Sequence, residues 1–175
     1  MDETIALIDK IIEEHRVTFR RFRSLEKVVG DIEAISGMEK AKEAFMPGRF
    51  DQKEGLKKLQ ESLETIDQGL QAHFNREETA LLAAFEKHGD RKLVSALNAL
   101  ILQHEDLRNR FAHSKKHVAE LVGGGLTHQK WEASAHDMRA HISHTRKLLE
   151  AHAAGEQPLL VELRRQLVEG TKGRD

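Results

Sequence analysis

The sequence repeats one spacing of two chemically active side chains. His73 and Glu77 are four residues apart in HFNRE, and His152 and Glu156 are four residues apart in HAAGE. Residues four apart on a helix share a face, so each imidazole and its carboxylate can serve one metal ion. The chain contains eleven histidines, and this excess is the compositional feature that a function has to explain.

The rest of the composition excludes several kinds of site. The 175 residues contain no cysteine, which excludes disulfides, thiolate zinc sites and cysteine-ligated clusters. Basic and acidic residues number 28 and 29, so the net charge of −1 predicts no attraction to nucleic acid or to an anionic membrane. No apolar run approaches the roughly 18 residues of a membrane span. We therefore expect a cytoplasmic protein whose metal ligands are nitrogen and oxygen.

Apolar residues recur three and four apart along nearly the whole chain, which predicts helix throughout. We expect one domain over residues 1–175, with a longer connection between the first two helices at about 37–53. Short connections elsewhere predict an all-α fold, an up-down-up-down antiparallel four-helix bundle. The expected helices span about residues 3–36, 54–88, 91–122 and 128–168.

Two of the predicted breaks have helix-capping residues. Gly89 can end a helix, and Asp90 can accept hydrogen bonds from the first amides of the next one. The three glycines at 123–125 form the other break, and Thr127 is the expected N-cap that follows them.

Histidine interrupts the apolar stripe of every expected helix. At about 1.5 Å per residue, heights measured from one end of the bundle place six polar stripe residues between about 16 and 24 Å. A buried unpaired carboxylate costs several kcal/mol unless a cation or hydrogen-bond partners compensate, so this layer requires a partner. The six residues are His15, His73, Glu77, His104, His152 and Glu156.

Four imidazoles and two carboxylates contain too much nitrogen for magnesium or calcium, and zinc usually takes four ligands. Two transition-metal ions fit better, with two histidines for each ion, both glutamates bridging, and open positions for a solvent-derived bridge or a diatomic ligand. Ferritin-like sites use Glu-x-x-His, and zinc proteases use HExxH. Neither string occurs in the chain. The alternative without metal is a set of buried histidines and glutamates hydrogen-bonded to each other.

The remaining histidines are expected to lie outside this layer. The third HxxxE, His128 to Glu132, begins the last helix about 36 Å from His152 and reads as a surface turn. The pair His113 and His117 is spaced for a metal but faces away from His104, so we expect two surface histidines. His141 is on nearly the same face as His152, about 16 Å away, and reads as a core or boundary histidine. The alternatives are that it lines access to the site or binds a further ion.

The segments around the six residues resemble the hemerythrin-like HHE cation-binding domain family over nearly the whole chain. The resemblance implies a non-heme di-iron centre at those six residues: two iron ions with an oxo or hydroxo bridge, with manganese or mixed occupancy as alternatives. Gly155 and Pro158 are expected to loosen or kink the last helix beside Glu156. The matching segments are IIEEHR, HFNREETALLAAFEKHG, LILQHEDLRNRF and HAAGEQPLL.

Three functions follow from these observations. The leading hypothesis is a binding protein, not an enzyme, whose di-iron centre takes O2 or a related ligand such as NO for sensing, storage or delivery. Apolar residues above and below the centre would protect the iron, and Phe19, Leu107 and Leu149 are expected among them. The second hypothesis is a di-iron enzyme or repair protein, with His141 as the candidate acid-base group. The third is a structural or signalling bundle stabilised by metal, with an unknown protein partner.

Overall fold

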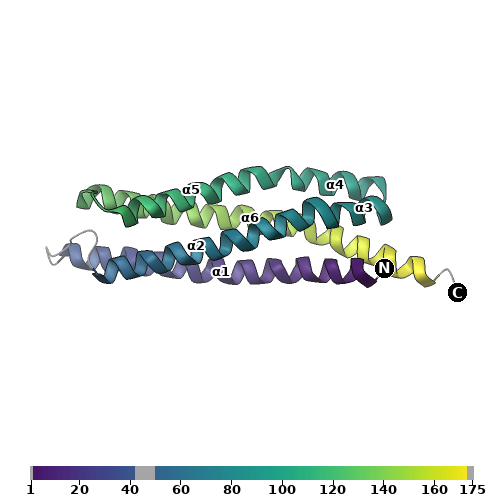
Figure 1. The fold of residues 1–175 in the computed structure, drawn as a ribbon, viewed down its shortest axis with the longest axis horizontal. Coiled ribbons are helices and arrows are strands. Elements are labelled where there is room, and N and C mark those ends of the chain that lie inside the picture. Colours follow the sequence, from purple (N-terminus) through teal and green to yellow (C-terminus); the bar gives the residue numbers. More distant parts are fainter. Residues whose placement is uncertain (1, 42–49, 173–175) are drawn as a thin grey trace.

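The computed structural model describes residues 2–41 and 50–172, and side chains within 3–30 and 54–170. This part of the chain is helical apart from short connections, so the predicted all-α class is confirmed. Figure 1 shows the helices lying side by side along the longest axis of the molecule. The elements are α1 (Asp2–Ala41), α2 (Phe50–Arg76), η1 (Glu77–Leu81), α3 (Leu82–His88), α4 (Arg91–Ile101), α5 (Gln103–Gly123) and α6 (His128–Lys172).

Both N-caps predicted from sequence are confirmed. The Asp90 carboxylate accepts hydrogen bonds from the backbone amides of Lys92 and Leu93, at 2.8 and 2.9 Å, and starts α4. The Thr127 hydroxyl accepts a bond from the Lys130 amide before α6. Gly124 and Gly125 have φ of 73° and 80°, a conformation that glycine adopts without the strain of a Cβ atom.

The first helix is longer than predicted. It was expected to end near residue 36, but α1 continues to Ala41, and α2 already begins at Phe50. A glycine inside a helix costs only about 1 kcal/mol relative to alanine, so Gly30 does not end α1 when good helix formers follow. The middle of the predicted 37–53 connection, residues 42–49, lies outside the described residues.

Two helices change geometry where polar residues meet the core. The segment η1 is a π-helical turn in which the Leu82 amide donates to the Glu77 carbonyl five residues earlier. Such turns occur mostly as single insertions, frequently at functional sites. The predicted helix at 91–122 is interrupted at Leu102, which is 81% exposed between α4 and α5. Neither irregularity was predicted.

The sequence predicted that Gly155 and Pro158 loosen or kink the last helix. In the structure, α6 is a single helix over its full described length, with Pro158 inside it. Gly155 lets the end of α4 approach closely, because a Cβ atom there would lie 3.2 Å from the Leu100 side chain. Beyond this contact α6 reaches the N-terminal part of α1, where Arg164 lies 3.6 Å from Asp9. Figure 1 shows the first residues of α1 and the last residues of α6 on that side of the molecule.

The buried apolar side chains form two clusters. One contains Phe22, Leu63, Phe74, Leu107 and Trp131, with further residues of α1, α2, α5 and α6. The other contains residues such as Ile8, Phe85 and Leu163. The buried histidines and glutamates fall between the two clusters along the helices, so the polar layer divides the core.

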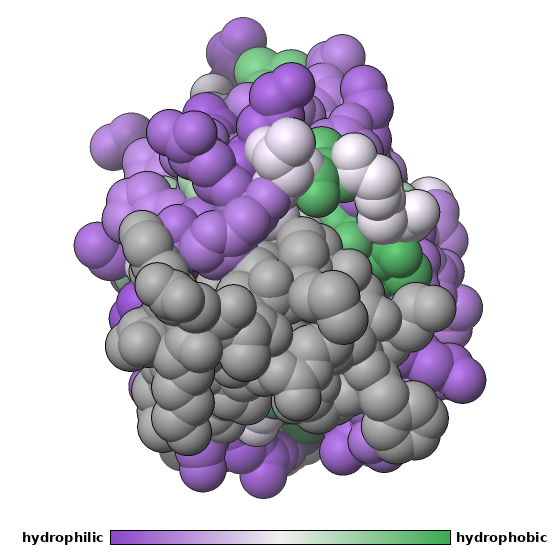
Figure 2. All heavy atoms as spheres, turned by 90° about the vertical axis from the view of Figure 1, so that its left-hand side faces the viewer, coloured by the Kyte–Doolittle hydropathy of each residue, from purple (hydrophilic) through white to green (hydrophobic). Residues whose placement is uncertain are grey.

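The outer surface is largely polar. Figure 2 looks onto the end at the left of Figure 1, and the described side chains there are predominantly hydrophilic. None of the helices in the described residues combines the length and apolar character that crossing a membrane requires.

Candidate metal centre

Four buried histidines, one each from α1, α2, α5 and α6, meet two buried glutamates. Each of the six residues is 7% exposed or less, although all carry ionisable groups. The structure therefore brings together all six residues that sequence spacing singled out, and they could hold metal. They are His15, His73, Glu77, His104, His152 and Glu156.

Their ligand atoms form two groups that share one carboxylate. Each group gathers ligand atoms within 4.8 Å of one another, and Glu77 belongs to both. The first group consists of His15, His73, Glu77 and Glu156, and the second of Glu77, His104 and His152.

Glu77 directs one oxygen at each pair of histidines. Its Oε1 lies 2.6 Å from His73 Nε2 and 3.6 Å from His15 Nε2. Its Oε2 lies 2.9 Å from His104 Nε2 and 3.7 Å from His152 Nε2. This is the arrangement of a carboxylate that can bridge two ions, one beside each oxygen.

Glu156 occupies a different position from the bridging one expected for both glutamates. Its Oε2 lies 3.3 Å from His15 Nε2, and it groups with His15 and His73 but not with His104 and His152. Its α6 backbone is closely packed against Leu100, at Gly155. As placed, Glu156 serves one of the two groups, and Glu77 is the carboxylate common to both.

Three of the histidines are oriented from outside by side-chain oxygens. His73 Nδ1 lies 2.8 Å from Glu14 Oε2, and His104 Nδ1 lies 2.8 Å from Glu78 Oε1. His152 Nδ1 lies 3.1 Å from Gln103 Oε1. Because these oxygens accept, each Nδ1 carries the donated hydrogen, which leaves Nε2 facing inward as a ligand atom. Metal-binding histidines are typically held in this way.

Two arginines hold the outer carboxylates in place. Arg76 donates to both oxygens of Glu14, and Arg108 donates to both oxygens of Glu78, at 2.7 and 3.1 Å. Despite partial burial, the pKa of Glu14 is lowered by its hydrogen bonds with His73 and Arg76, and the pKa of Glu78 by those with Arg108 and His104. Both outer groups therefore stay ionised as hydrogen-bond acceptors for the histidines.

Several inward-facing atoms lack a hydrogen-bond partner among the described residues. They include His15 Nε2, His73 Nε2, Glu77 Oε1 and both carboxylate oxygens of Glu156. His73 Nε2 and Glu77 Oε1 are only 2.6 Å apart, yet their directions do not form a hydrogen bond. Buried polar atoms are rarely left unsatisfied, and lone pairs that converge on common points fit a bound cation. The donor set therefore suits a metal.

The pKa values of the buried residues indicate where a metal ion has to displace a proton. Burial alone would lower the pKa of His73, but the hydrogen bond with Glu14 and the adjacent Glu77 carboxylate raise it to about 9. Burial, with the nearby Glu77 carboxylate, raises the pKa of Glu156. The pKa of Glu77 falls well below its usual value despite burial, because imidazoles surround it. Binding of a cation must displace the proton on His73.

Aromatic and aliphatic side chains line the centre. Phe74 stacks on His104, with ring centroids 4.1 Å apart, and lies edge-on to His152 at 6.2 Å. Phe19 is near His15 at a centroid distance of 6.3 Å. Leu107 and Leu149, expected as neighbours of the site, belong to the same apolar cluster as Phe74.

The other expected access residue, His141, lies elsewhere. Its Nε2 is 3.0 Å from the Arg110 carbonyl oxygen, and its ring lies beside His113 at 4.9 Å. His128 and Glu132 are 3.8 Å apart at the start of α6, where a surface turn was expected. Neither His141 nor His128 belongs to the two metal-capable groups.

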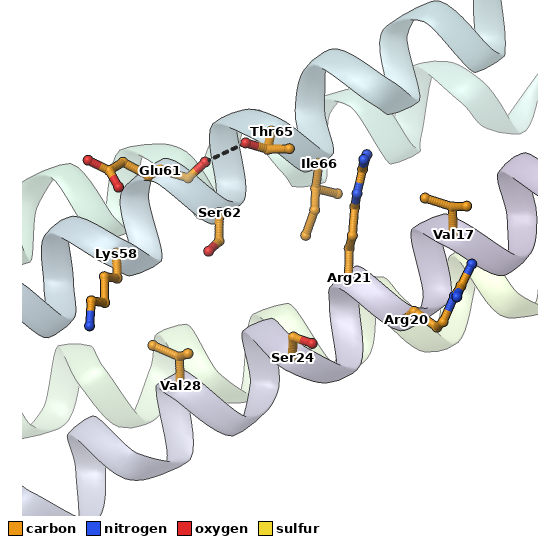
Figure 3. A pocket seen from close by; sticks show the side chains of 10 residues that line it. All are labelled: Val17, Arg20, Arg21, Ser24, Val28, Lys58, Glu61, Ser62, Thr65 and Ile66. Carbon is orange, nitrogen blue, oxygen red and sulfur yellow. Dashed lines mark hydrogen bonds between the residues drawn. The ribbon is translucent and has the colours of Figure 1, made fainter.

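A groove on the surface lies away from the centre. It runs between α1 and α2, has a volume of about 620 Å³, and is lined by none of the six residues. Figure 3 shows Arg21 extending from α1 toward α2 across this groove. Because the four histidines of the centre are 7% exposed or less, a ligand that reaches them has to pass between packed side chains.

Replacement of Glu14 tests whether its carboxylate holds His73 in position for metal binding. Glu14→Ala removes the acceptor of His73 Nδ1, and the loss of such an outer partner typically lowers metal affinity about 10–100-fold. Competition with a chelator measures the affinity. The matched control is Glu13→Ala, whose carboxylate is exposed and pairs with Arg16 and Arg20. Equal affinities for the two variants would contradict a role for Glu14 in orienting His73.

The outer partners and Phe74 were missed from the sequence. Glu14, Glu78 and Gln103 each adjoin a predicted ligand, a signal that was present. Their contacts reach across to other helices or past the π-helical turn, so counting along one helix could not identify them. Phe74 directly follows His73, so it does not share the three- and four-residue spacing that defines the predicted core-facing stripe of α2.

No family model, no curated protein and no solved structure matches this chain.

Proposed function

We propose that this chain is a hemerythrin-like protein whose antiparallel, up-down-up-down four-helix bundle holds two iron ions and binds O2 or a related small ligand. The observation that carries the proposal is the pair of histidine groups that share Glu77. The alternative without metal accounts for Glu77 Oε2, which lies 2.9 Å from His104 Nε2. It leaves both oxygens of Glu156 and Nε2 of His15 without hydrogen-bond partners, although all three are buried.

Two histidines would hold each iron, and Glu77 would be the residue common to both sides. His15 and His73 lie on one side and His104 and His152 on the other, with Glu156 next to the first pair. Four protein residues on one side and three on the other would leave positions for a small ligand. Bound iron would supply reversible electron transfer to that ligand.

The protein's own side chains would keep this chemistry reversible. Phe74 and the apolar clusters on either side of the polar layer exclude water. Glu14 and Glu78 hold hydrogens on the outer nitrogens of His73 and His104, so neither imidazole is released easily. Four imidazole ligands favour fixed iron over the passage of iron into a store.

The enzyme alternative has lost the side chain on which it depended. His141 was its candidate acid-base group, and His141 Nε2 bonds to the Arg110 carbonyl beside His113. The scaffold alternative relied on the connection from Gly30 to Gly55, of which residues 42–49 lie outside the described residues. The binding function is therefore the one that the geometry of the centre supports best.

Metal analysis and spectra of the reduced protein test the proposal. With ferrous iron and air in excess, we expect about two irons per chain, no mineral, and a reversible charge-transfer band with O2 or NO, or with azide after oxidation. The control is His73→Ala with His104→Ala, which removes one histidine from each group. Uptake of many irons, or a filled site that ignores every ligand, would overturn the proposal. Sustained consumption of peroxide would support the enzyme instead.

A further inference from the structure

Three histidines outside the buried centre lie together on α5 and α6, and we call them the histidine cluster: His113, His117 and His141. His113 and His117 are four residues apart on α5, and His141 approaches them from α6. The centroid of the His141 ring lies 4.9 Å from that of His113 and 6.2 Å from that of His117. His113 is exposed, and the other two are half-buried.

His113 and His117 are close to the geometry of a chelating pair. Their Nε2 atoms are 2.9 Å apart. Two histidine nitrogens about 2.0–2.1 Å from a tetrahedral zinc ion would be roughly 3.3 Å apart, so a small rotation of the exposed ring suffices. Neither nitrogen would need a change of the α5 backbone.

The third histidine has a tautomer suited to binding. A carbonyl oxygen only accepts, so His141 Nε2 carries the hydrogen that it donates to the Arg110 carbonyl at 3.0 Å. In the neutral ring, Nδ1 then bears a lone pair. A backbone carbonyl that holds the far nitrogen of a histidine is a common outer partner at metal sites. The contact also anchors His141 while His113 remains free to turn.

The charges around the cluster permit a neutral, metal-binding form. The pKa of His113 is lowered, mainly by desolvation and further by the neighbouring imidazoles and Lys116. Glu120 opposes this effect as the nearby acid. The Arg110 guanidinium pairs with Asp106 at 2.8 Å.

We propose that the histidine cluster binds one divalent cation of the zinc, nickel and copper class, with water completing the coordination. Imidazole nitrogen suits these three ions. The site is separate from the buried centre, because His113 follows His104 by nine residues, or about 13 Å of helix. His141 precedes His152 by eleven residues, or about 16 Å. Unlike the buried centre, it opens to solvent and can exchange its ion.

Zinc titration of the full-length protein tests this site. Zinc binding to iron-loaded protein is measured by competition with a chromophoric chelator, for the wild type and for His113→Ala, His117→Ala and His141→Ala. We expect each variant to bind one zinc fewer per chain in the range that saturates the wild type, with affinity at the cluster lowered at least about 10-fold. The three variants leave the buried centre intact, so its occupancy cancels in the comparison.

The matched control is His144→Ala, an exposed histidine on α6 three residues beyond His141. It should bind as much zinc as the wild type. Equal zinc binding by all variants, or equal losses in the control and the cluster variants, would overturn the proposal. A loss with His113→Ala and His117→Ala but none with His141→Ala would overturn the three-histidine assignment. Thermal melts confirm that each variant is folded, and a zinc-induced rise in Tm specific to the wild type and the control would support the site.

Discussion

Glu77→Ala is expected to abolish binding of both metal ions, with a larger effect than any other single substitution in the centre. Glu77 is the residue common to the two metal-capable groups, and its oxygens approach all four histidines. Removal of an outer hydrogen-bond partner costs about 10–100-fold in metal affinity, so removal of a shared ligand should exceed roughly 100-fold at both positions. Metal content per chain after dialysis, together with chelator competition, measures the loss.

Two neighbours provide a graded comparison for Glu77. Glu156 groups with one histidine pair, so Glu156→Ala should weaken that ion more than the other. Glu78 contacts His104 from outside, and Glu78→Ala should cost only about 10–100-fold. The expected order of losses is therefore Glu77, then Glu156, then Glu78.

Folding of the Glu77 variant needs its own control. Removal of one partner from a buried ion pair destabilises a protein by about 3–5 kcal/mol. Glu77→Gln retains the volume and one oxygen while removing the charge, so it should remain folded and still lose metal. Two normally bound metals in the double variant Glu77→Ala, Glu156→Ala would contradict the assignment of the centre.

Sequence spacing could locate each histidine–glutamate pair because its two residues follow each other at helical spacing along the chain. His73 and Glu77 share a face through the four-residue repeat, and the same rule places His152 with Glu156. The N-caps Asp90 and Thr127 were predictable for a similar reason, since a cap depends on amides two or three residues away. All-helical structure followed from periodicity alone.

Contacts between helices could not be predicted in that way. Both glutamates were expected to bridge, because their spacing from histidine is identical. The structure separates their roles, with Glu77 at the start of a π-helical turn and Glu156 beside the close contact of Gly155 with Leu100. The approach of Glu14 to His73 joins α1 to α2, and no periodicity within one helix specifies it.

The metal-free protein is expected to lose stability as the pH rises from about 6.5 to about 9. His73 has its ordinary pKa near 6.5 when unfolded and a pKa of about 9 when folded, since Glu14 and Glu77 hold its proton. A group whose folded pKa is raised stabilises fully below its unfolded pKa, and this contribution disappears as the pH passes the folded value. The difference corresponds to about 3 kcal/mol.

The other groups of the centre with shifted pKa values either favour the folded state when protonated, as His73 does, or contribute a constant stability between pH 6.5 and 9. The pKa values of His15 and Glu156 are also raised, so their protonated forms favour the folded state. The pKa values of Glu14 and Glu77 are lowered, and their contributions are fully present above about pH 4.5. They add no slope between pH 6.5 and 9.

The metal-loaded protein should respond in the opposite sense. Histidine binds a metal only after losing its proton, so metal binding strengthens as the pH rises and transfers that gain to the folded state. Denaturant unfolding of chelator-treated and metal-loaded protein across this pH range measures both slopes. His73→Gln, which removes the titrating ring, should flatten the metal-free slope, whereas the exposed-residue control His144→Gln should not. Parallel slopes with and without metal would contradict binding by these histidines, because metal would then not be competing with their protons.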